Sequence, residues 1–254
     1  MGFFSYEATV PFEMFGPAHL VTLVVLAVAL LWVYFYFREC SETRKQLGAN
    51  VMAGLLVVSE ISITIWGSKW FTDFNPTENL PLHLCGLSIL LSALMLWRRS
   101  YLLFEILYFA GIAGSLQALI TPYLIHGFPH FRFIQLFLSH GLIIAAVVFM
   151  ISSEGFRPRP ASILKSLLFL VIAGPIVGGL NYLMQFVPPY KIGNYFFLCY
   201  KPGSASLLDA LPGWPYYLIL MLLLALVFFA ILYLPYFIAD LRNRSQSGLT
   251  AGQG

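Results

Sequence analysis

The chain of 254 residues is 59% hydrophobic, 17% aromatic and only 10% charged, with a net charge of +3. Soluble domains carry about 25% charged residues, so this composition excludes a soluble globular protein. The aromatic content also excludes a disordered chain. The apolar runs are continuous and long enough to cross ~30 Å of hydrocarbon, whereas the strands of a membrane barrel alternate apolar and polar residues. The composition therefore predicts an all-α, polytopic membrane helix bundle.

Seven apolar segments are predicted to cross the membrane as helices. They are residues 19–37, 46–67, 81–97, 101–121, 132–152, 163–186 and 214–237. The third is expected to begin at Pro81, because proline suits the first position of a helix. Residues 1–240 are expected to form a single transmembrane domain and residues 241–254 a disordered cytoplasmic tail. No basic residue precedes the first segment, so we expect that segment to remain as an anchor.

The distribution of lysine and arginine predicts the orientation of these helices. Four of the 14 basic residues fall on one side, and ten fall on the other. The ten are Arg38, Arg44, Lys45, Arg98, Arg99, Arg157, Arg159, Lys165, Arg242 and Arg244. Because basic loops stay in the cytoplasm, the N-terminus is expected outside and the C-terminus inside. Basic residues scattered between apolar runs are typical of signals that orient membrane helices. They form no basic patch, so we expect no nucleic-acid partner.

Polar side chains inside the predicted helices gather in the outer half of the membrane. Five helices each place one such residue there: Glu60, His83, Gln117, His140 and Asn181. Only Asn50 and Glu105 fall in the inner half. Such residues in hydrocarbon cost free energy, so they usually face the bundle interior and either join helices or build a functional site.

Helical spacing sorts these residues into stripes. Arg132, Gln135, Ser139 and His140 share one helix face, Gln117 lies one turn before Thr121, and Glu60 lies one turn before Thr64. His140 is the best candidate for a general base, because histidine titrates near neutral pH. Cys85 is a candidate nucleophile, although it points away from His83 on the same helix. The three cysteines have no zinc-site spacing, and we expect no metal and no cofactor.

Several short stretches together resemble the YwaF-like family of bacterial integral membrane proteins. They are LPLHLC at 80–85, GIAGSLQALITP at 111–122, FPHFRF at 128–133, SHGLI at 139–143 and NYL at 181–183. The resemblance implies a multi-pass protein of the bacterial cell membrane. That family is distantly similar to a eukaryotic transmembrane phospholipid acyltransferase, which uses a cysteine directly before a histidine and a second histidine on a later helix. By this resemblance His83 and His140 match the two histidines. Leu82 stands at the cysteine position, with Cys85 three residues further on.

The leading hypothesis is a lipid-directed enzyme of the outer leaflet, catalysing acyl transfer or lipid ester hydrolysis on a phospholipid or acyl substrate. His140, His83 and Cys85 are the candidate catalytic residues, and a bound water or a substrate hydroxyl is an alternative nucleophile to Cys85. The candidate substrate-binding residues are Glu60, Gln117, Thr121, Gln135, Asn181 and Arg132. A proton-coupled transporter, or a membrane protein that binds a lipid or small molecule with the same cluster, is the alternative. A structural or assembly factor is a third hypothesis.

Overall fold

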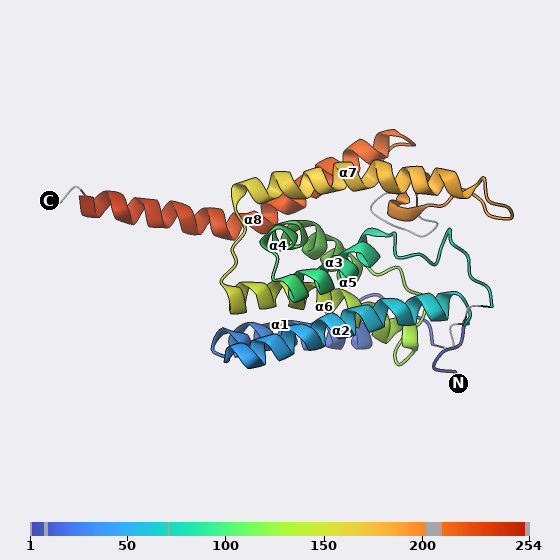
Figure 1. Cartoon of the computed structure of the whole chain (residues 1–254), viewed down its shortest axis with the longest axis horizontal. Coiled ribbons are helices and arrows are strands. Elements are labelled where there is room, and N and C mark those ends of the chain that lie inside the picture. Colours follow the sequence, from blue (N-terminus) through green and yellow to red (C-terminus); the bar gives the residue numbers. More distant parts are fainter. Residues whose placement is uncertain (1, 8–9, 71, 202–209, 252–254) are drawn as a thin grey trace.

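A computed structural model describes residues 2–7, 10–70, 72–201 and 210–251, with side chains to residue 243. Seven helices make up this part of the chain (Figure 1). They are α1 (Pro17–Arg38), α2 (Glu42–Gly67), α3 (Leu84–Arg98), the continuous run of α4 (Tyr101–Ile106), η1 (Leu107–Gly111) and α5 (Ile112–Ile120), α6 (Phe131–Glu154), α7 (Pro160–Met184) and α8 (Tyr216–Ala251). A short 3₁₀ turn, η2 (Tyr195–Phe197), precedes α8. In the described ranges there is no strand, only an isolated bridge between Pro11 and His126.

All seven predicted helices are present, and six of them are long and apolar enough to cross a membrane. The exception is α3, which has 15 residues and falls short of the roughly 20 that a span needs. The predicted start at Pro81 is wrong, because Leu80 to His83 form a turn in which the Leu82 N–H donates to the Leu80 carbonyl (2.8 Å). His83 then takes an extended conformation and becomes the N-cap of α3.

The fifth of these seven helices, α6, lies at the centre of the bundle. In its apolar stretch 78% of the residues are buried, against 11% in α1 and 17% in both α7 and α8. It packs on α1, α2, α3 and α5, while α1 and α2 lie on one side of the bundle and α7 and α8 on the other (Figure 1). Gly141 permits the close approach of α6 to α1, since a Cβ at this position would lie 2.7 Å from the Leu26 side chain of α1. Polar residues of α6 are therefore carried into the protein interior and not toward lipid.

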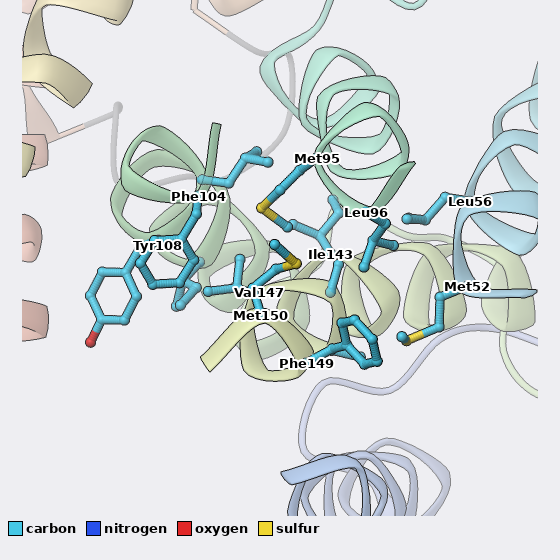
Figure 2. Close-up of a cluster of buried hydrophobic side chains, with 14 of the residues drawn as sticks. Met52, Leu56, Met95, Leu96, Phe104, Tyr108, Ile143, Val147, Phe149 and Met150 are labelled. Atoms are coloured by element: carbon cyan, nitrogen blue, oxygen red, sulfur yellow. The ribbon is translucent and has the colours of Figure 1, made fainter. Parts of the chain in front are cut away.

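An apolar core fills the half of the bundle away from the N-terminus. Its buried side chains come from α1, α2, α3, α4, η1, α5, α6 and α8. Figure 2 labels Met52, Leu56, Met95, Leu96, Phe104, Tyr108, Ile143, Val147, Phe149 and Met150. Tyr108 turns its hydroxyl away from this cluster (Figure 2) and donates to the Leu232 carbonyl of α8 (3.0 Å). In this way the core also joins α8 to the other helices.

Charged residues gather at one end of the bundle, which we call the basic end. Arg99 after α3 pairs with Glu154 of α6 and with Glu42 of α2 (3.7 Å), and Arg157 pairs with Asp240 of α8. Three loops that were predicted to share the cytoplasmic side therefore do meet at one end. The two chain termini lie at opposite ends of the molecule (Figure 1). Which end faces the cytoplasm stays a prediction.

The C-terminal helix extends beyond the predicted span. We expected disorder from residue 241, whereas α8 continues to Ala251. Between Pro235 and Gly248 the sequence contains no proline or glycine that would end a helix. Residues 252–254 lie outside the described part.

Candidate functional site

His140 is buried on α6 with one ring nitrogen engaged and the other free. Its Nδ1 lies 2.8 Å from the Leu136 carbonyl and 3.3 Å from the Ser139 hydroxyl. Because a carbonyl only accepts hydrogen bonds, Nδ1 carries the proton of the neutral ring. Nε2 then carries the lone pair, and it is buried with no hydrogen-bond partner among the described residues. A buried, unpaired imidazole nitrogen is a group that can accept a proton from a bound molecule.

The predicted stripe on α6 extends from this histidine to the N-terminal end of the helix. Arg132 Nη1 donates to Gln135 Oε1 (2.7 Å), and Gln135 Nε2 donates to the Ser59 hydroxyl of α2 (3.4 Å). The guanidinium also lies over the ring of Trp66, 5.7 Å from its centroid. No carboxylate of the described residues lies within ion-pair distance of Arg132. The arginine is thus held by neutral groups, and its charge is available to an anion.

Glu60 is, after Arg132, the second charged residue of this region that has no ion-pair partner among the described residues. Its carboxylate is half-buried between α2 and α3, and a Cβ at Gly86 would lie 3.0 Å from its Oε1. Within the described part it makes no hydrogen bond and no ion pair. Glu105, the other acidic residue predicted inside the membrane, differs because it accepts from Ser162 (2.7 Å) and pairs with Lys165. Glu105 therefore joins helices, whereas Glu60 does not. We call the hydrogen-bonded residues Ser59, Arg132 and Gln135, together with His140 on the same helix, the α2–α6 polar cluster.

Asn181 has both groups of its amide occupied by backbone. The side chain is fully buried, with Nδ2 donating to the Tyr195 carbonyl (2.9 Å) and Oδ1 accepting from the Tyr195 N–H (3.0 Å). The Tyr195 hydroxyl in turn donates to the Pro76 carbonyl (2.8 Å) and accepts from the Leu80 N–H (2.9 Å). Burial raises the pKa of Tyr195 to about 12, so the phenol keeps its proton. This asparagine–tyrosine clamp, Asn181 and Tyr195, ties α7 to the segment before α3.

His83 lies directly under this clamp. Its ring centroid is 4.9 Å from that of Tyr195 and 5.4 Å from that of Phe197. The backbone that supplies this cover is unusual, because Phe196 and Phe197 both have positive φ, 61° and 55°, a conformation rare for bulky residues. Cys85 is half-buried and reduced, and in the described part it makes no hydrogen bond to His83 or His140.

Gln117 and Thr121 bond to each other and not to the cluster. Gln117 Nε2 lies 2.5 Å from Thr121 Oγ1, one turn apart at the end of α5, and the pair is exposed. The predicted neighbours are therefore confirmed as a local pair. The structure does not join them by a hydrogen bond to the α2–α6 polar cluster or to the clamp.

The end of the site at the start of α6, opposite the basic end, is covered by the N-terminal segment. His126 and His130 stack with ring centroids 4.1 Å apart. His130 Nε2 donates to the Ser5 carbonyl (2.8 Å), and His126 Nε2 lies 3.3 Å from the Tyr6 carbonyl. Burial lowers the pKa of His126, with the neighbouring His130 and Arg132 acting in the same direction. We call this contact between residues 2–7 and the 121–130 loop the outer cap.

A comparison with protein-family models places these residues in a known family. The model described as the TMEM164 family matches residues 14–233, a region that contains every candidate residue named above. The chain belongs to the TMEM164 family. It is a transmembrane protein family, in agreement with the six long apolar helices. Comparisons with curated proteins and with solved structures gave no match.

Several residues that shape the site in this TMEM164-family chain were not predicted. Tyr195 lies in a loop without hydrophobic periodicity, so no pattern marks it as the partner of Asn181. Trp66 contacts Arg132 through its ring face, and Ser59 receives a hydrogen bond from Gln135. Aromatic residues are common at the helix ends of membrane proteins, where they act as interface anchors. The sequence alone therefore does not distinguish Trp66, which contacts a specific arginine, from such an anchor.

Proposed function

We propose that this TMEM164-family chain is a membrane-embedded lipid-directed enzyme that transfers or hydrolyses an acyl ester, with His140 as its general base. The observation that carries the proposal is the buried Nε2 of His140, which has a lone pair and no partner in the described structure. Its other nitrogen is held by the Leu136 carbonyl, which orients the ring and favours the imidazolium once a proton has been taken up. On the same helix face Arg132 donates to Gln135, and its positive charge, which has no ion-pair partner among the described residues, is available to an anionic group of the substrate.

In the proposed reaction, His140 Nε2 removes the proton from a water or a substrate hydroxyl as its oxygen attacks the ester carbonyl carbon. The carbonyl oxygen becomes an oxyanion, which a donor such as the guanidinium of Arg132 would stabilise. Collapse of the tetrahedral intermediate breaks the ester C–O bond. The imidazolium returns its proton to the leaving alkoxide, so the histidine ends as it began. Water as nucleophile gives hydrolysis, and a lipid hydroxyl gives acyl transfer.

A covalent route through Cys85 has less support from this geometry. The thiol has no hydrogen bond to either histidine in the described part, so no base is in place to deprotonate it. His83 packs under the clamp against Tyr195 and Phe197 and makes no hydrogen bond to Cys85 in the described part. Asn181 is occupied by Tyr195 and is proposed as a positioning residue instead of an oxyanion donor.

The test is acyl release or transfer from labelled phospholipids by purified protein, comparing wild type, His140→Ala and Cys85→Ala. We expect His140→Ala to lower turnover by about 10²–10⁴-fold and Cys85→Ala to leave it within a few-fold. Loss in both variants would restore the covalent cysteine route. Undiminished turnover in His140→Ala would refute the role of His140.

Glu60 favours a second candidate function, a proton-coupled transporter or a protein that binds a lipid or small molecule. A half-buried carboxylate without a cation partner is typical of proton and ion pathways in membranes. This candidate predicts uptake or efflux driven by a pH gradient in proteoliposomes, abolished in Glu60→Gln, with no lipid product formed. Lipid turnover without such transport would exclude it.

The location that accompanies the proposal is the bacterial cell membrane, with the basic end in the cytoplasm and the N-terminus outside. It is supported by the YwaF-like motifs and by the gathering of basic loops at one end of the bundle. Reactivity of a cysteine introduced at exposed Tyr123, tested with a membrane-impermeant reagent on intact cells, checks the orientation. Labelling only after lysis would reverse it.

A further inference from the structure

A cavity of about 510 Å³ lies at the basic end, away from the proposed active site. It opens between the start of α4, the loop that joins α6 to α7, and α8. Its polar lining includes Tyr101, Arg157, Arg159, Tyr233 and Asp240. The volume is within the range of about 300–1,000 Å³ that is typical of small-molecule sites.

The loop that supplies both arginines is held in a defined shape. Gly155 ends α6 with φ of 65°, a conformation that glycine adopts without strain. Pro158 and Pro160 restrict the backbone on either side of Arg159. The Tyr101 hydroxyl donates to the Arg157 carbonyl (2.6 Å). The arginines are therefore presented at the cavity by a preformed loop and do not require ordering when a ligand binds.

The cavity has an excess of positive charge. Arg157 is balanced by Asp240 and also donates to the Tyr236 carbonyl (3.2 Å). Arg159 lies over the Tyr101 ring, 5.1 Å from its centroid, and no carboxylate of the described residues is within ion-pair distance of it. The N-terminus of α7 begins beside it at Pro160, and its dipole adds to the positive potential.

We propose that this cavity binds the phosphate of an anionic lipid headgroup. Guanidinium groups recognise phosphate through paired, charge-assisted hydrogen bonds. Basic pockets at the cytoplasmic ends of membrane helices bind anionic lipid headgroups. Because the cavity lies at the end of the membrane spans, we assign the bound phosphate to a lipid and not to a soluble anion. The tyrosine rings supply apolar walls for the glycerol portion of such a headgroup.

The test measures binding of dihexanoyl phosphatidylglycerol by calorimetry to the full chain in nanodiscs of phosphatidylcholine. Arg159→Gln is expected to weaken binding by about tenfold. Arg98→Gln is the matched control, because Arg98 lies at the same end but does not line the cavity, and it should stay within about twofold. Asp240→Asn removes the cavity's carboxylate and should tighten binding, a gain that misfolding cannot imitate.

Two results would overturn the proposal. Equal losses of affinity in Arg159→Gln and Arg98→Gln would show that the lipid responds only to diffuse surface charge. No binding by the wild type would refute the site outright. A parallel titration with inorganic phosphate distinguishes the source of the anion. Phosphate that binds as tightly as the lipid and competes with it would assign the cavity to a soluble anion and refute the lipid assignment.

Discussion

Replacement of Asn181 by alanine tests whether the asparagine–tyrosine clamp holds together the end of the bundle opposite the basic end. The amide is fully buried and satisfies both the N–H and the carbonyl of Tyr195. Alanine would leave these two backbone groups without partners, at about 1–3 kcal/mol each. Water entering the vacated space recovers part of that loss, so we expect destabilisation of about 3 kcal/mol.

The assay is thermal unfolding of the purified protein, followed together with lipid turnover. A loss of about 3 kcal/mol corresponds to a fall in Tm of roughly 6–12 °C for a chain of this size. Asn50→Ala is the control, because exposed Asn50 only accepts a hydrogen bond from Gln46 (2.9 Å), and it should change stability by less than about 0.5 kcal/mol. An unchanged Tm with lost activity would refute the clamp and return Asn181 to direct contact with substrate.

Three further predictions concern the outer cap and the two membrane carboxylates. Because burial lowers the pKa of His126, protonation favours the open cap. The closed cap should therefore be stable above about pH 6.5 and loosen as the pH falls below it; hydrogen exchange of residues 2–7 measures this, and a pH-independent rate would contradict it. Glu105→Gln should lower stability by about 1–3 kcal/mol because Glu105 loses its ion pair, whereas Glu60→Gln should stay within about 0.5 kcal/mol; thermal unfolding of the two variants side by side checks the contrast. Gly127→Ala should destabilise the cap by about 1–3 kcal/mol, since its Cβ would lie 2.6 Å from a backbone carbonyl of the N-terminal segment. Gly54→Ala, with nothing within 4 Å, should be neutral or stabilising in the same melting assay.

The number and order of the helices could be predicted from apolar runs alone, because each membrane span must satisfy its own backbone hydrogen bonds over ~30 Å. Helix ends were harder to predict. Pro81 suits a first helical turn by itself, but the Leu80 N–H is bonded to Tyr195, 115 positions away. That contact fixes Leu80 at the start of a turn that ends at His83, so α3 begins only at Leu84.

The polar stripe on α6 was also predictable, since positions three and four apart share a helix face, and Arg132 does bond to Gln135. Which polar residues are free was not predictable. Glu60 and Glu105 are both glutamates inside apolar helices, yet only Glu105 has a lysine and a serine facing it from α7. Pairing depends on which neighbour each helix face meets.

The sequence by itself therefore determined an all-helical membrane protein of seven helices with its basic loops at one end, while the placement of its polar residues in the outer half of the membrane stays a prediction. Hydropathy and helical periodicity are local properties, and they need no knowledge of neighbours. Only the tertiary structure decided that α6 is the central helix, that Asn181 is occupied by Tyr195, and that His140 keeps one nitrogen free. These depend on contacts between residues far apart in the chain, which local periodicity does not encode.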